Sequence, residues 1–155
     1  MPNQYLDQIE QVFTSVLEQL TFMFAELTPK EELPADVESP LLVEVGFSGH
    51  AQGKLQLISP KSICHEMACN MLGLDADDEF DVEPTYDALR ELLNVTCGQL
   101  LTTIAGDKPV FDLSPPSVTP LPNDSWKTKI REEQSIGFIV DDSPMLIAFS
   151  MAQDS

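Results

Sequence analysis

The strongest constraint on how this chain folds is one long amphipathic helix, predicted over Tyr86 to Ile104 and reading YDALRELLNVTCGQLLTTI. Because a helix turns by about 100° per residue, side chains three and four positions apart share a face. The apolar stripe consists of Leu89, Leu93, Cys97 or Thr96, Leu100 and Ile104. The polar stripe consists of Asp87, Glu91, Asn94 and Gly98. The two stripes face opposite ways, so one face covers a core and the other meets water.

The polar stripe differs from an ordinary solvated helix face, which more often carries pairs of Lys and Glu. It offers an acid, an amide and then a glycine. A glycine inside an exposed helix costs about 1 kcal/mol relative to alanine. Gly98 therefore predicts that something approaches the backbone closely at this point. The competing interpretation is an exposed face that carries Glu91 and Asn94 by chance.

Length and charge limit the classes of protein. The chain has 155 residues and a hydrophobic fraction of 43%, which suits a single globular domain with one core. Its net charge is −18, with only 8 basic residues. Binding to nucleic acid or to an anionic membrane needs clustered Lys and Arg, so neither partner is expected. No signal peptide or membrane-spanning run is visible, which favours a cytoplasmic protein.

The three cysteines, Cys64, Cys69 and Cys97, all lie in helical patterns. An odd number of cysteines in such positions favours small buried side chains in a reducing compartment over disulfides. Cys97 lies on the core flank of its helix with no activating partner, so a nucleophilic role is not expected.

The remaining chain reads as an alternation of helices and hairpins. A first long helix is predicted over residues 4–27, with Phe24 on its apolar face, and a proline-rich loop follows to residue 40. Strands at 41–47 and 53–58 form a hairpin, and a helix at 60–72 ends at Gly73. Residues 74–82 form an acidic connection, and residues 110–125 form an extended edge segment or loop. Strands at 134–140 and 145–151 form a last hairpin, which makes the fold α+β with long helices on a largely antiparallel sheet.

A weak internal repeat accompanies this layout. A shift of 80 residues aligns the two long helices and places Asp7 on Asp87 and Leu20 on Leu100. The single domain, residues 1–155, is therefore predicted to contain a duplication of about 4–60 and 84–152, with two pseudo-equivalent helices. Gln11 and Thr14 stand where the second helix has Glu91 and Asn94, so only the second helix keeps the polar stripe.

No metal site is predicted. Cys64 and His65 are adjacent, so they point in different directions, and the only other histidine, His50, lies in a turn. The acids at 75–79 lack the glycine and the terminal glutamate of a calcium loop, so a solvated loop is expected there. The sequence also lacks a phosphate-binding glycine loop and a nucleophile elbow.

Glu91 and Asn94, one turn apart on a rigid helix, form a pair with complementary abilities. An amide both donates and accepts hydrogen bonds, so Asn94 is able to hold one water in a chosen orientation. A carboxylate is able to anchor a cation on a partner. This pair suits hydrolysis of an activated phosphoryl group, because that reaction depends mainly on positioning and electrostatics.

These residues resemble the helix motif of the CheX and CheC group of chemotaxis phosphatases. That motif has an Asp or Ser, three residues, Glu, two residues and Asn, with a glycine following, and Asp87, Glu91, Asn94 and Gly98 match it. A proline about 22 residues beyond the Asn belongs to the same pattern, and Pro116 in the segment FDLSPP stands there. The resemblance implies a CheC-like fold and covers the whole chain loosely.

The resemblance also implies a target, the phosphorylated receiver domain of a CheY-like response regulator. Asn94 would orient the attacking water, and Glu91 would pair with the receiver's active-site lysine. Asp87, Gly98 and Pro116 would contact or position the partner. The chain would need no cofactor of its own, because the Mg²⁺ would belong to the receiver. Members of the group form dimers through a shared sheet, so a homodimer is expected, through the edge at 110–113 or the C-terminal hairpin.

Two alternatives stay open at this point. The first is a binding module of the same fold, of the adaptor or flagellar-switch type, that binds a receiver without hydrolysis. The second is a purely structural homodimer, which leaves the polar stripe without a function.

Overall fold

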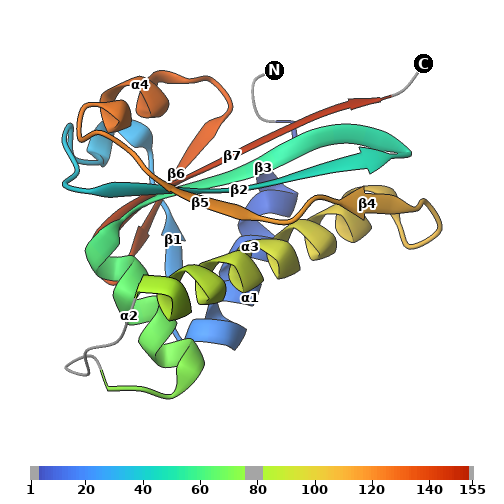
Figure 1. The fold of residues 1–155 in the computed structure, drawn as a ribbon. Helices are drawn as coiled ribbons and strands as arrows, with labels where there is room; N and C mark the ends of the chain where they lie inside the picture. Colours follow the sequence, from blue (N-terminus) through green and yellow to red (C-terminus); the bar gives the residue numbers. More distant parts are fainter. Residues whose placement is uncertain (1–3, 76–81, 154–155) are drawn as a thin grey trace.

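The architecture is a seven-stranded antiparallel sheet with helices on both faces (Figure 1). The computed structural model describes residues 4–75 and 82–153. The strands are β1 Ala25–Leu27, β2 Pro40–Gly49, β3 Ala51–Pro60, β4 Phe111–Leu113, β5 Ser117–Pro120, β6 Ser135–Val140 and β7 Ser143–Gln153. The helices are α1 Leu6–Thr21, α2 Lys61–Leu72, α3 Val82–Ala105 and α4 Ser125–Arg131, with a short 3₁₀ turn, η1, at Lys30–Glu32. The predicted α+β class is confirmed.

The strand order is β1-β6-β7-β3-β2-β4, and β5 also pairs with β2. Both predicted hairpins, β2–β3 and β6–β7, are present, and each is antiparallel. The β6–β7 hairpin turns at Asp141 and Asp142, where both residues have positive φ, as in the tight turns that match the twist of a hairpin. The two hairpins pair through β3 and β7, which form the centre of the sheet.

Helices α1, α2 and α3 cover one face of the sheet and enclose the main core (Figure 1). The strands contribute alternate residues to this core, for example Val43 and Val45 on β2 and Leu55 and Leu57 on β3, as a half-buried sheet requires. A smaller cluster around Trp126 of α4 covers part of the other face. The main core holds α3 against the sheet.

The first helix is shorter than predicted, because it ends at Thr21 rather than at residue 27. Phe22 adopts a left-handed conformation, with φ of 61°, and its N–H donates a hydrogen bond to the carbonyl of Glu18. The chain then enters β1, which pairs with β6. Phe24, predicted on the apolar helix face, is instead 70% exposed. Pairing with an available strand edge overrides the helical periodicity here.

The segment after the long α3 helix is also more ordered than its prolines suggest. The predicted extended edge segment is present as β4 and β5, but α4 was not predicted. Trp126 is fully buried, and its Nε1–H donates a hydrogen bond of 3.0 Å to the carbonyl of Pro34. A contact between residues 92 positions apart has no local signal in the sequence. This contact anchors α4 to the loop after β1.

Other boundaries agree with the predictions or extend them. The α2 helix ends at Gly73, whose φ of 71° is the left-handed cap that glycine adopts without strain. The α3 helix begins at Val82, before the predicted start. Most of the predicted acidic connection, residues 76–81, lies outside the described residues.

Candidate functional site

The α3 helix presents the two stripes that its sequence predicts. Its buried residues include Leu89, Leu93, Cys97 and Leu100, which pack in the main core, and Thr96 is buried beside them on the same helix. Ile104, the last residue of the predicted stripe, is partly buried against the same core. The prediction of the core-facing stripe is therefore confirmed.

The polar stripe faces outward. Asp87, Glu91 and Asn94 are exposed, and Gly98 is partly exposed. Among the described residues, neither Glu91 nor Asn94 has a hydrogen-bond or ion-pair partner within the chain. Both side chains are thus available to a molecule that approaches α3 from outside.

A hollow of about 300 Å³ joins most of the residues that the sequence singles out. One wall comes from α3 and carries Asp87, Glu91 and Asn94. The opposite wall comes from the connection between β4 and β5 and includes Pro116. The tertiary structure therefore brings Pro116 beside the helix motif, although 22 residues separate it from Asn94 in the sequence.

Gly98 lies outside this hollow. It lines a neighbouring hollow of about 520 Å³, which shares Asn94 and continues along α3 past Thr102. A Cβ atom placed on Gly98 would meet nothing within 4 Å. The fold itself therefore does not require a glycine at this position, and the absent side chain leaves the helix backbone open to an approaching molecule.

Arg90 is a member of the first hollow that sequence reasoning missed. Its Nη1 lies 2.6 Å from Asp87 Oδ1 and 3.5 Å from Glu83 Oε2, and its guanidinium Cζ lies 6.0 Å from the centre of the Tyr86 ring. The spacing of Asp87 and Arg90, three positions apart on a predicted helix, was a readable signal for this pair. Asp87 is therefore paired within the chain, whereas Glu91 has no such partner in the part of the chain that the structure describes.

Two of the three cysteines, Cys64 and Cys97, are unsuited to nucleophilic chemistry. All three cysteines are buried, and none of them forms a disulfide among the described residues. Burial raises the pKa of the Cys64 thiol to about 12, against a smaller lowering by a hydrogen bond with Ser59. Burial also raises the pKa of Cys97 to about 12. Both thiols stay protonated at neutral pH, and the thiolate is the reactive form.

The described residues contain no group of three or more His, Cys, Asp or Glu side chains placed to hold a metal ion. Within the same part of the chain, no helix is both long and apolar enough to cross a bilayer.

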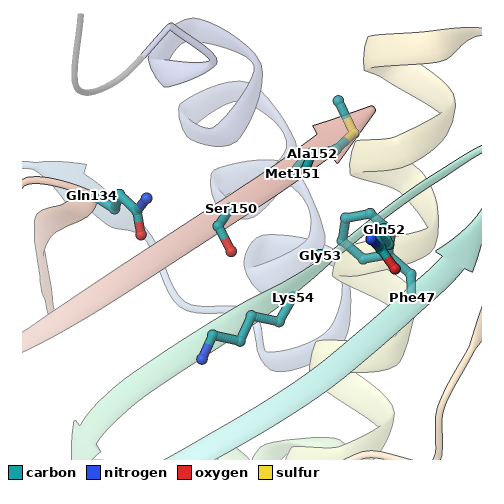
Figure 2. Close-up of a pocket in the computed structure, with 8 residues that line it drawn as sticks. All are labelled: Phe47, Gln52, Gly53, Lys54, Gln134, Ser150, Met151 and Ala152. Carbon is teal, nitrogen blue, oxygen red and sulfur yellow. The ribbon is translucent and has the colours of Figure 1, made fainter. Parts of the chain in front are cut away.

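The largest hollow that we describe, about 590 Å³, lies elsewhere, at the ends of β3 and β7 (Figure 2). Lys54, Gln134 and Ser150 surround it. The Lys54 side chain is 54% exposed, and its Nζ lies 3.9 Å from Glu44 Oε2. Its positive charge is therefore already paired with a carboxylate. None of the residues singled out by the sequence lines this hollow, and we assign it no function.

The expected dimer edges differ in their availability. The strand β4, which contains most of the predicted segment 110–113, ends the strand order and leaves one edge open. The C-terminal hairpin lies partly inside the sheet, because β1 pairs with β6 from Phe138 to Val140 and β3 pairs with β7 along most of its length. Among the described residues, however, β6 pairs with β7 only from Ser143 to Ala148, so β7 from Phe149 to Gln153 also keeps an open edge.

Comparison with known proteins agrees with this architecture. The family model described as chemotaxis phosphatase CheX matches residues 41–135. No curated protein matches the chain. Among solved structures, the chemotaxis protein CheX from Vibrio vulnificus has a TM-score of 0.73 at 15% identity, covering 98% of this chain and 99% of that one.

Two further structures share the fold. The CheX of a CheX–CheY–BeF₃–Mg²⁺ complex from Borrelia burgdorferi has a TM-score of 0.59 at 20% identity, covering 97% of this chain and 99% of that one. FliY from Thermotoga maritima has a TM-score of 0.58 at 17% identity, covering 95% of this chain and 88% of that one. The family match spans more than half of the sequence, and the chain therefore belongs to the CheX family of chemotaxis phosphatases.

Proposed function

We propose that this chain hydrolyses the aspartyl phosphate of a CheY-like receiver domain. The observation that carries the proposal is the position of Glu91 and Asn94. Both are exposed on a rigid helix and have no partner among residues 4–75 and 82–153, and both border a hollow that Pro116 lines from the other side. An acid and an amide in this setting are able to engage a phosphorylated partner without rearranging the fold.

In the proposed reaction, the Asn94 side chain orients one water toward the phosphorus atom of the receiver's phosphoaspartate. The water oxygen bonds to phosphorus, the bond from phosphorus to the aspartate oxygen breaks, and the products are inorganic phosphate and the free aspartate. Glu91 pairs with the receiver's active-site lysine and so fixes the register of docking. Phosphoryl transfer needs mainly such positioning and electrostatic stabilisation, and the receiver's Mg²⁺ supplies the charge.

The comparisons support this assignment at the level of family and partner. The family model is that of a chemotaxis phosphatase. The Borrelia burgdorferi complex joins a CheX protein of this fold to CheY with Mg²⁺ present. By extension, the partner of this chain is a receiver domain that carries its own Mg²⁺.

The remaining residues of the motif take supporting roles in the proposal. Pro116 forms the wall opposite Asn94, and Gly98 admits the receiver close to the helix backbone. Asp87 acts through Arg90, to which it is paired, and so shapes the rim of the hollow.

The net charge of −18 means that long-range attraction to an acidic receiver pocket does not drive their encounter. The complex therefore rests on close contacts and on the charge pair made by Glu91, and it is transient. We further propose a homodimer, in which the open edge of β4 pairs with a second copy.

The decisive experiment compares Asn94→Ala with the native sequence for the decay of phosphate on a purified receiver. Asn94→Ala is expected to remove most of the activity, while circular dichroism and the unfolding midpoint stay unchanged. The matched control is Gln11→Ala, which removes an exposed amide from the other long helix. Equal decay rates with Asn94→Ala and the native chain would overturn the assignment.

A second candidate function is binding without hydrolysis. FliY from Thermotoga maritima has the same fold, which shows that this architecture is not confined to the CheX proteins. Against this candidate, simple binding does not need a water-orienting amide. Capture of a phosphorylated receiver with no loss of its phosphate would favour the binding module.

A further inference from the structure

The wall of the 300 Å³ hollow that lies opposite Asn94 contains a β-bulge, in which two prolines, Pro115 and Pro116, stand between β4 and β5. Leu113 pairs with Phe47 at the end of β4, and Ser117 pairs with Glu44 at the start of β5. Ser114 lies beside Gly46, which leaves Pro115 and Pro116 opposite the single residue Val45. An extra residue in one strand bends that strand away from its ladder. Prolines suit this position because they have no N–H to offer to the ladder.

Ser114 fastens the strand to β2 just before the bulge. Its N–H donates a hydrogen bond of 2.8 Å to the carbonyl of Gly46. The N–H of Gly46 in turn donates a hydrogen bond of 2.9 Å to the Ser114 hydroxyl oxygen. The hydroxyl thus takes the place of a main-chain carbonyl as the acceptor, which frees the backbone of residue 114 to turn away.

Gly46 provides the space for this fastening. A Cβ atom on Gly46 would lie 3.3 Å from the Ser114 hydroxyl oxygen, which is shorter than an ordinary van der Waals contact. The Ser114 hydroxyl also lies 3.3 Å from the Gly46 carbonyl and is able to donate to it. The absence of a side chain at Gly46 thus leaves room for the Ser114 hydroxyl, and the hydroxyl in turn bonds to the Gly46 backbone.

The bulge then bows toward α3. Leu113, Ser114, Pro115 and Pro116 together form one wall of the hollow of about 300 Å³ whose other wall carries Glu91 and Asn94. The helix wall is fixed by the main core. The strand wall carries partly or fully exposed residues and depends on its edge bonds to β2.

We propose that Ser114 is a positioning residue for receiver docking: its hydroxyl, bonded to Gly46, holds the proline bulge at the distance from α3 that a receiver requires. This inference rests on the proposed function. Ser114 does not touch the reacting atoms in this scheme. It sets the width of the opening through which the receiver reaches Asn94.

The test is steady-state dephosphorylation of a phosphorylated receiver by Ser114→Ala, with KM and kcat measured separately. Loss of one neutral hydrogen bond predicts a KM about five-fold higher, with kcat unchanged within about two-fold. Ser114→Thr keeps the hydroxyl and is expected to restore the native KM. Gly46→Ala crowds the hydroxyl from the other strand and is expected to raise KM in the same way.

The matched control is Asn123→Ala. Asn123 Oδ1 accepts a hydrogen bond of 2.9 Å from the N–H of Ser39, so this variant also removes an exposed side-chain acceptor that joins distant segments. Asn123 lines neither hollow on α3. Its loss is expected to leave both KM and kcat unchanged.

Two outcomes would overturn the inference while the proposed function stands: an unchanged KM in Ser114→Ala, or a lower kcat that Ser114→Thr does not restore. Amide hydrogen exchange gives a readout independent of activity, because the Gly46 amide is expected to exchange faster in Ser114→Ala than in the native chain. Unchanged exchange at Gly46 would also overturn the inference. If the native chain shows no phosphatase activity but Gly46 exchange responds as expected, the proposed function is wrong, whereas the hydrogen bond between Gly46 and Ser114 is confirmed.

Discussion

Asp87 and Arg90 form an ion pair on the exposed side of α3, with 2.6 Å between Asp87 Oδ1 and Arg90 Nη1. Both residues border the hollow that also holds Glu91 and Asn94. Because Arg90 engages Asp87 and Glu83, the Glu91 carboxylate has no partner among the described residues. Of the two acids of the motif, Asp87 is thus paired within the chain, and Glu91 stays available for the proposed receiver.

Removal of this pair is expected to affect function more than stability. Arg90→Gln leaves Asp87 as an unpaired carboxylate at the rim, which repels an acidic receiver. The KM for the receiver should rise at low ionic strength and return toward the native value at high salt, because the Debye length is only about 3 Å at 1 M salt. The unfolding free energy should fall by no more than about 0.5 kcal/mol, since both side chains are partly exposed.

Lys129→Gln is the control for this prediction. It breaks another pair spaced by three residues, at the end of α4 and away from the hollow, in which Lys129 Nζ lies 3.6 Å from Glu132 Oε1. It should produce a similarly small change in stability and no change in KM. An equal rise in KM for both variants would show that the effect of Arg90→Gln reflects net charge alone.

Gly98→Ala is expected to move stability and function in opposite directions. The new Cβ meets nothing within 4 Å, and alanine favours a helix interior over glycine by about 1 kcal/mol, so the unfolding free energy should rise by about that amount. Receiver binding should weaken, because the methyl group occupies the approach to the backbone. Denaturant unfolding and receiver titration measure the two effects.

Gly73→Ala provides the contrasting case. Gly73 has φ of 71°, and alanine is strained in that region, so this variant should lose stability. If Gly98→Ala binds the receiver as tightly as the native chain does, Gly98 has no role in docking.

Phe22→Gly is expected to stabilise the fold. Phe22 is 74% exposed and adopts φ of 61° at the end of α1, where a residue with a Cβ pays roughly 1–2 kcal/mol relative to an unstrained conformation. Glycine removes this cost but loosens the unfolded chain, so the net gain should be about 0.5–1 kcal/mol. Thermal unfolding measures it.

Phe24→Gly serves as the comparison, because Phe24 is similarly exposed, at 70%, and does not have a positive φ. It should show no gain. If both variants gain equally, the cause is the loss of exposed apolar surface and not the relief of backbone strain.

The buried thiols predict a pH dependence of stability. In the folded chain the pKa of Cys64 and Cys97 is raised to about 12, from 9.0 in the unfolded chain. Above pH 9 the unfolded state releases these protons and the folded state keeps them, so the unfolding free energy falls as pH rises from 9 toward 12. Well below pH 9 both states are protonated, and these groups contribute no slope.

Denaturant unfolding at pH 7, 9 and 10 tests this sign. The Cys64→Ala, Cys97→Ala double variant corrects for lysine and tyrosine titration in the same range. Its stability should fall less steeply between pH 9 and 10 than that of the native chain. Equal slopes would show that the thiols do not contribute.

The sequence determined the parts of this protein that follow from local periodicity. The spacing of Leu89, Leu93 and Leu100 requires a helix with one buried face, and the same geometry places Glu91 and Asn94 on the opposite face. The two hairpins and the buried cysteines were predictable for the same reason. The roles of the exposed residues stay a proposal, and the internal duplication stays a prediction.

The tertiary structure decided what depends on contacts between distant residues. The end of α1 is set by pairing of β1 with β6, and α4 is anchored by the bond from Trp126 to Pro34. The hollow exists only because Ser114 and the proline bulge lie along β2 beside α3. Local sequence patterns do not predict such contacts. The free energy that stabilises them comes from packing between residues that are far apart in the sequence and that come together only in the folded chain.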